Sequence, residues 1–125
     1  MIVTPSPHPY EETCRRLTEA IERRSLTVFT RIDHAAGARE AGLEMPDEQV
    51  VVFGNARAGT PLMISDPQVG IELPLRVLIW AGEGGVSLGF RDPRELDGAY
   101  AISGHAQTLE QMATLLGEVV AEAAG

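Results

Sequence analysis

The sequence predicts a two-layer α+β fold, in which two helices pack on one side of a single sheet. Three observations support this prediction: an amphipathic helical segment near each end of the chain, several β-rich segments, and a strong hairpin signal in the second half. The length of 125 residues favours one domain over residues 1–125. Because each predicted helix has one apolar stripe, packing both on one sheet face is the simplest way to bury them.

The N-terminal segment predicts a strand followed by a helix. Met1–Thr4 is apolar and partly β-branched, and prolines at positions 5, 7 and 9 are expected to end the strand. Beyond them, Cys14, Leu17 and Ile21 recur at spacings of three and four. Proline suits the first turn of a helix, so we expect a helix over about 9–24.

A second strand and a short helix are predicted next. The alternation in Leu26–Asp33 predicts a strand with Val28 and Ile32 on one face and Phe29 on the other. The small residues of 35–42 predict one or two helical turns that end at a glycine.

The middle of the chain predicts a strand and a loop. Gln49–Gly54 is a continuous β-rich run, which is typical of a central strand. Asn55–Gly70 is rich in glycine, proline and aspartate and is expected to be a loop, with a short helical turn starting at Pro61.

The second half predicts a hairpin and a final helix. Two alternating segments, 73–82 and 86–90, are joined by Glu83-Gly84-Gly85. Thr108 and Gln111 have the spacing of a capping box that would begin the last helix. Its apolar stripe is formed by Met112, Leu115, Leu116 and Val119.

Charge and cysteine content narrow the classes of partner and compartment. The net charge is −8, all ten basic residues are arginine, and the whole excess of acid lies after residue 40. Such a surface repels nucleic acid and anionic membranes, so neither is expected as a partner. The N-terminus lacks a signal-peptide pattern, and Cys14 is the only cysteine. We therefore expect a cytoplasmic, bacterial-type protein with a core thiol at Cys14.

Asp33 and His34 form the first candidate site, at the end of a predicted strand. The functional interpretation is a base oriented by a carboxylate, or a ligand contact. The structural alternative is that Asp33 caps the following helical turn while His34 faces solvent. Neighbouring side chains on a strand point to opposite faces, so the two need not act together.

The second candidate site is the segment GNARAGTP at residues 54–61. Its backbone N–H groups could bind an anion with help from Arg57, and Thr60 could cap a turn beginning at Pro61. It lacks the ending of a phosphate-binding P-loop, so a structural loop remains the alternative. Whether the two candidate sites meet depends on strand direction, because a connection of about fourteen residues fits a parallel or an antiparallel pair.

Four segments in matching order resemble the domain-of-unknown-function family 302. They are SLTVFTRIDHAAGAREAGLEMP, FGNARAGTPLMISDP, LPLRVLIWAGEGGV and FRDP, and together they cover nearly the whole chain. This chain departs from the usual family pattern at Ser25, where glycine is usual, at Ala56, where proline is usual, and at Phe90, where tyrosine is usual.

The resemblance implies a compact α+β fold similar to the TATA-binding-protein-like class. Its sheet would be curved and mainly antiparallel, with about five strands in the order β-α-β-β-β-β-α, and two main helices on one face. The resemblance implies no established activity. The shared motif positions are Asp33, His34, Gly54, Asn55, Gly59, Thr60, Pro61, Leu73, Pro74, Asp92 and Pro93.

The function best supported by the residues is binding or sensing of a small molecule, possibly an anion. The candidate ligand-binding residues are Asp33, His34, Asn55, Arg57, Gly59 and Thr60. A homodimeric interaction module is the alternative, because Leu78 and Trp80 would lie on a half-apolar sheet face. An enzyme with His34 as base has least support, since no second catalytic partner occurs at a fixed spacing. The three histidines are scattered, so we expect neither a metal nor a cofactor.

Overall fold

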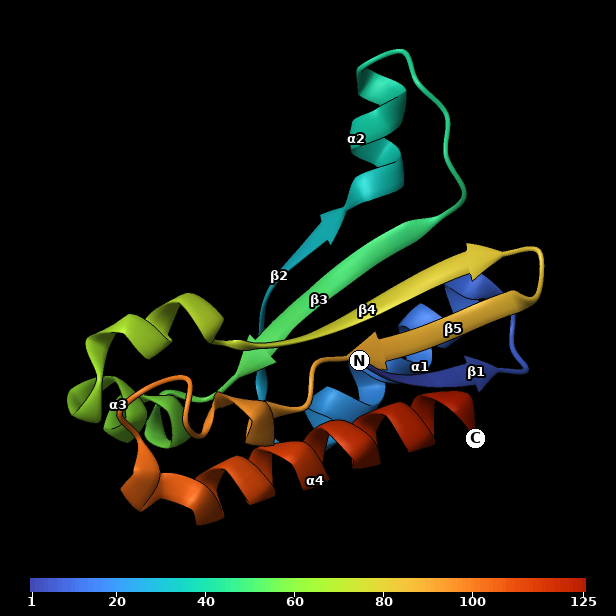
Figure 1. Cartoon of the computed structure of the whole chain (residues 1–125). Coiled ribbons are helices and arrows are strands. Elements are labelled where there is room, and N and C mark those ends of the chain that lie inside the picture. The colour runs from blue at the N-terminus through green and yellow to red at the C-terminus, as the bar shows by residue number, and fades with distance from the viewer.

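The computed structural model describes residues 1–125 and contains one five-stranded antiparallel sheet, with strand order β1-β5-β4-β3-β2 (Figure 1). The strands are β1 (Ile2–Ser6), β2 (Thr27–Asp33), β3 (Glu48–Gly54), β4 (Leu75–Gly82) and β5 (Gly85–Phe90). The α-helices are α1 (Tyr10–Arg23), α2 (His34–Glu40), α3 (Ala56–Ser65) and α4 (Ala106–Ala124). Short 3₁₀ helices are η1 (Pro67–Glu72), η2 (Pro93–Leu96) and η3 (Ser103–His105). The predicted α+β class and hairpin are therefore confirmed.

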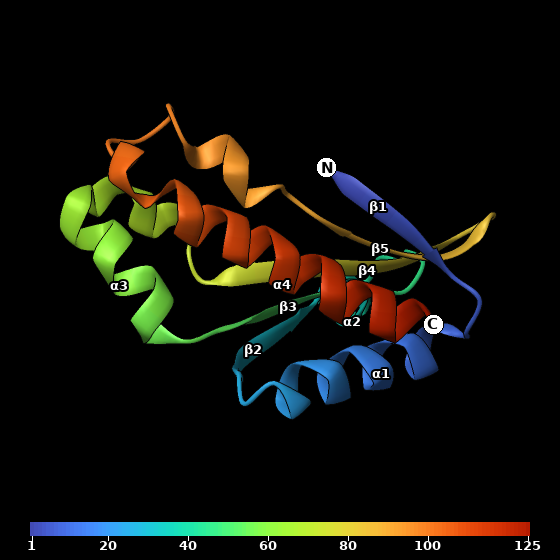
Figure 2. The same ribbon diagram turned by 90° about the horizontal axis from the view of Figure 1, so that it is seen from below.

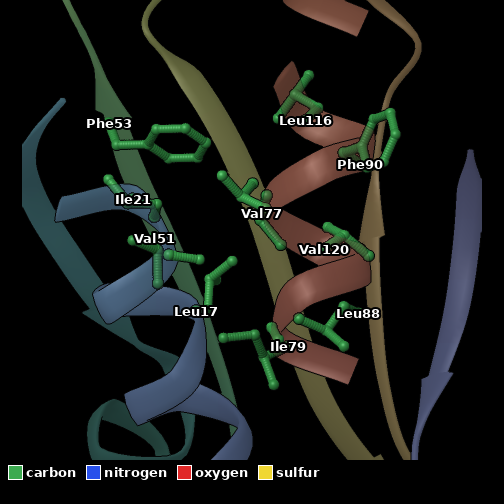
Figure 3. Close-up of a cluster of buried hydrophobic side chains, with 13 residues drawn as sticks. Leu17, Ile21, Val51, Phe53, Val77, Ile79, Leu88, Phe90, Leu116 and Val120 are labelled. Carbon is green, nitrogen blue, oxygen red and sulfur yellow. The ribbon is translucent and has the colours of Figure 1, made fainter. Parts of the chain in front are cut away.

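Helices α1 and α4 lie side by side on one face of the sheet (Figure 2). The main core fills the space between them and the strands, as Figure 3 shows. Its labelled side chains come from both helices and from β3, β4 and β5: Leu17, Ile21, Val51, Phe53, Val77, Ile79, Leu88, Phe90, Leu116 and Val120. Burying each such side chain contributes about 1.5–3 kcal/mol, so this layer provides most of the stability.

A second, smaller core joins α3 and η1 to the N-terminal half of α4. It consists of Leu62, Val69, Ile102, Leu109 and Met112. This cluster holds α3 against the end of the sheet at which β3 finishes. It is the reason that a segment expected to be a loop becomes a helix there.

The opposite sheet face has no covering helix. Side chains on it include Leu78 and Trp80, which are half-buried, and Val3 and Ile32, which are exposed. Trp80 packs over Gly89 of the neighbouring strand, where a Cβ atom would come within 3.1 Å of the indole ring. The open sheet face is therefore partly apolar, although no helix covers it.

Two predicted boundaries are wrong for reasons that the sheet makes clear. β1 continues through Pro5 to Ser6, because β1 is an edge strand and the missing N–H of a proline is tolerated there. The run Asn55–Gly70 is mostly helical, as α3 and η1, because Leu62 and Val69 are drawn into the second core.

Ser25, between α1 and β2, has a left-handed backbone with φ of 57°. Glycine adopts this conformation without the cost that a side chain imposes. The departure from the family pattern at this position therefore falls where glycine has a physical advantage.

Candidate functional site

Asn55 positions the start of α3 at the end of β3. Its backbone is extended, and its Oδ1 accepts a hydrogen bond from the Ala58 N–H at 3.1 Å. This is the geometry of a helix N-cap. The helix therefore begins at Ala56, five residues before the predicted start at Pro61, and the predicted cap at Thr60 is wrong. Pro61 lies inside the helix, where it cannot donate to the carbonyl four residues before it.

A cavity of about 270 Å³ lies between α3 and α4. Its walls come from the beginning of β2, from α3, from the segment leading into β4 and from α4. The lining contains no ionisable side chain; the polar groups on it belong to Asn55, Thr60, Thr108 and Gln111. The cavity is thus suited to an uncharged, mainly apolar molecule with one or two hydrogen-bonding groups.

Phe29 reaches this cavity because β2 is irregular. The register between β2 and β3 shifts between Val28 and Thr30, so Phe29 is an extra residue in the strand. Val28 pairs with Phe53, and Arg31 pairs with Val51, which places Val28 and Arg31 on the same face. The predicted alternation, with Val28 and Ile32 on one face, is therefore wrong beyond this bulge.

Thr108 and Gln111 line the cavity instead of forming a capping box. Helix α4 begins at Ala106 and has no side-chain cap, so both residues already lie within it. Residues three apart share one face of a helix. The spacing that predicted a cap is also the spacing that directs both side chains to the same wall of the cavity.

Asp33 and His34 lie at the far end of β2. Asp33 Oδ1 accepts a hydrogen bond from the Ala36 N–H at 2.9 Å and caps α2. His34 is exposed, and its ring makes no hydrogen bond or ion pair. The capping interpretation of Asp33 is confirmed, and the ring of His34 is not oriented by the neighbouring carboxylate.

The two candidate loops lie at opposite ends of the same strand pair, as Figure 1 shows for α2 and α3. In the antiparallel register Thr27 pairs with Gly54, whereas Asp33 pairs with Gln49. A single site made from residues 33–38 and 54–61 is therefore wrong. Of the six candidate residues, Asn55, Gly59 and Thr60 line the cavity, while Arg57 lies on α3 outside its lining.

Cys14 lies on α1, near the Asp33 end of the sheet. It is partly buried, and its Sγ accepts a hydrogen bond from Gln49 Nε2 at 3.0 Å. Burial raises the pKa of the Cys14 thiol to about 11. Burial also raises the pKa of Tyr10, whose hydroxyl is buried without a hydrogen-bond partner. Because the thiolate is the nucleophilic form, this cysteine is a packing residue, as predicted.

No three of the histidine, cysteine, aspartate and glutamate side chains cluster closely enough to hold a metal ion. None of the helices has the length and apolar content that crossing a bilayer requires.

The fold and cavity define a small α+β domain with two helices on one face of an antiparallel sheet and a neutral cavity at one end. The chain belongs to the family described as "Domain of unknown function DUF302", whose sequence pattern matches residues 2–122. A crystal structure of an uncharacterized conserved DUF302 protein from Bacillus stearothermophilus is similar, with a TM-score of 0.87. The match covers 98% of this chain and 96% of the other, at 16% sequence identity, and it establishes the shared fold.

Curated relatives match over the whole chain. Proteins named "Fluoride-specific ion channel FluC 1" from Brucella suis and Brucella abortus are each 36% identical to this chain over 127 residues. The aligned region is 50% of the first protein and 47% of the second. The chain thus spans about half the length of these relatives.

Proposed function

We propose that this domain binds a small, uncharged and mainly apolar molecule in the cavity between α3 and α4. The observation that carries the proposal is the lining, which combines apolar side chains with four hydrogen-bonding side chains and no ionisable group. Desolvating a charged ligand against such walls would be costly, whereas an apolar ligand gains by leaving water. The volume of about 270 Å³ fits a molecule of fragment size.

The capping role of Asn55 argues against an anion at this position. Its Oδ1 already takes the Ala58 N–H, which is one of the free donors that an anion at the start of α3 would need. Arg57 is on the same helix but outside the lining. The ligand class is therefore narrowed from a possible anion to a neutral molecule.

The test uses indole, a neutral aromatic molecule with one N–H donor, and a variant that fills the mouth of the cavity. Gln111 is exposed and lines the cavity, so Gln111→Trp is expected to block it without disturbing the core. The matched control is Gln107→Trp, one turn earlier on α4 and outside the lining. Ligand-observed NMR should show indole binding to the parent and to the control but not to Gln111→Trp. Equal binding by both variants, or none by the parent, would refute the proposal.

A homodimer formed through the open sheet face is the second candidate. It is favoured by the exposed apolar side chains on that face, of which Ile32 is 47% exposed. Light scattering of Ile32→Lys, with Ile64→Lys on α3 as the control, tests it. A dimer lost only in Ile32→Lys supports this candidate, and a monomeric parent protein at high concentration eliminates it.

The curated relatives support the proposal that this domain works in cells alongside fluoride transport. In those proteins, a region 36% identical to this whole chain makes up about half of a polypeptide named as a fluoride channel. We expect a strain lacking this chain to grow less well in fluoride. Full recovery with the Gln111→Trp variant would separate that role from the cavity, and unchanged growth of the deletion strain would contradict the proposal.

A further inference from the structure

A second cavity, of about 410 Å³, lies where β4 begins and β5 ends. It is separated from the first by side chains that line both, namely Leu73, Leu75 and Met112. Its lining differs in kind, because it includes the charged residues Glu72, Arg76, Arg91, Asp92 and Glu95. The neutral cavity has none of these.

Two arginines line this cavity, Arg76 on β4 and Arg91 directly after β5. Leu78 pairs with Gly89, Arg76 lies two residues before Leu78, and Arg91 lies two residues after Gly89. The β4–β5 ladder ends at the Leu78–Gly89 pair, so both arginines lie just beyond the last paired residues, and both line the cavity. Because two like charges line one cavity, an anion bound near both reduces their mutual repulsion.

Neither of these arginines is held by a short ion pair. Arg91 makes no ion pair or side-chain hydrogen bond, and the contact of Arg76 with Glu72 is long, at 3.7 Å. Glu72 Oε2 instead accepts a hydrogen bond from the Tyr100 hydroxyl at 2.8 Å.

The charges around this cavity are close to balanced. Asp92 is held by Arg94, with an N–O distance of 2.7 Å, so its charge is already compensated. Glu95 is exposed and unpaired. With Arg94 included, three arginines balance three carboxylates here, although the chain as a whole carries a net charge of −8. An incoming anion therefore meets less repulsion at this cavity than over most of the surface.

We propose that this second cavity binds an organic carboxylate with an apolar body. Arg76 and Arg91 hold the carboxylate through charge-assisted hydrogen bonds. The apolar body lies against Val50 and Leu78, which line the same cavity. The ligand class thus differs from that of the neutral cavity, and the two assignments stand on separate observations.

The test compares hexanoate with two probes of similar length, neutral hexanamide and cationic hexylamine. Arg91→Gln and Arg76→Gln remove one charge each, and Arg57→Gln on α3 is the matched control, because Arg57 is exposed and lines neither cavity. Calorimetry or NMR titration should show hexanoate binding at least about tenfold more weakly to Arg91→Gln than to the control. Hexanamide, which carries no charge, should bind weakly and with equal affinity to Arg91→Gln and to the Arg57→Gln control.

Three results would overturn the proposal. They are unchanged hexanoate affinity in both cavity variants, tighter binding of hexylamine than of hexanoate, and loss of hexanoate binding in Gln111→Trp. The last result would place the carboxylate in the neutral cavity. Retained hexanoate binding in Gln111→Trp, together with loss of indole binding, supports two independent sites.

Discussion

The two ends of the β2–β3 pair have the same local design and different surroundings. At each end a strand leads into a helix whose N-cap is an aspartate or asparagine: Asp33 bonds Ala36, and Asn55 bonds Ala58. Each helix carries a glycine at its fourth position, Gly37 in α2 and Gly59 in α3. Locally the two junctions are close to interchangeable.

The two junctions differ in their tertiary contacts. Helix α2 extends beyond the sheet (Figure 1), and Ala35 is its only buried residue. Helix α3 packs against α4 through the second core and closes a cavity. The comparison teaches that an Asx cap followed by small residues specifies how a helix starts, while a binding cavity requires a second element opposite.

The largest expected difference between the two ends concerns side-chain burial. Leu62→Ala in α3 should lower the free energy of unfolding by about 2–4 kcal/mol, because Leu62 is completely buried in the second core. Leu43→Ala, just after α2, should change it by less than about 0.5 kcal/mol, since Leu43 is 65% exposed. Urea denaturation measures both. Similar losses would mean that the α2 end is as well packed as the α3 end.

The second largest difference is expected between the stability effects of the two helix caps. Asn55→Ala is expected to lower global stability by about 1 kcal/mol, because α3 unfolds together with the core that it covers. Asp33→Ala should instead fray α2 alone, which hydrogen exchange at Ala36 would report as faster exchange. If both variants lost the same global stability, the two helices would belong equally to the cooperative unit.

The paired glycines give a smaller effect of the opposite sign. A Cβ atom on Gly37 would meet nothing within 4 Å, so Gly37→Ala should raise the free energy of unfolding by about 0.5–1 kcal/mol. Gly59→Ala should raise the free energy of unfolding by less, because its Cβ would lie 3.4 Å from Leu73 Cδ1. Gly59→Ala should also weaken indole binding, since Gly59 lines the neutral cavity. Thermal unfolding with and without indole tests this. Weaker indole binding in Gly37→Ala would contradict this expected difference between the two glycines.

An effect of similar size is a pH dependence at the Asp33 end. The thiol of Cys14 has its pKa raised from 9.0 to about 11 by burial, so the unfolded chain loses this proton first as the pH rises. Stability contributed by the buried thiol is therefore full below pH 9 and falls above it. After allowance for partial exposure, we expect a loss of roughly 0.5–1 kcal/mol between pH 8 and 10.

Cys14→Ala is the control for that titration. Denaturation at several pH values should show a flatter profile in the variant than in the parent over this range. A profile of unchanged slope would assign the loss to other groups.

The sequence predicted the fold well because its evidence is local and periodic. The apolar spacing in α1, the hairpin at Glu83–Gly85 and the cap at Asp33 each depend on residues close in the chain. The cap at Asn55 was missed because Pro61 is a strong helix-start signal, and only packing of Leu62 shows why the helix tolerates a proline inside it.

The candidate site was less predictable, since it depends on strand direction and on one extra residue. A connection of the observed length fits either direction, so the separation of Asp33 from Asn55 could not be read from the chain. No glycine or proline lies at the Phe29 bulge, so no local sequence signal predicts it. The spacing of Thr108 and Gln111 predicted a capping box, which is wrong, because the same spacing also places two side chains on one helix face.

Leu73, Leu75 and Met112 form a common wall, and this has a consequence for how the two cavities can diverge during evolution. A substitution at any of these residues reshapes both cavities at once. Independent change of ligand preference is therefore confined to residues that face only one cavity, such as Phe29 and Gln111 on one side and Arg76 and Arg91 on the other. Variation among relatives should be freer at those four positions than at the three residues of the wall.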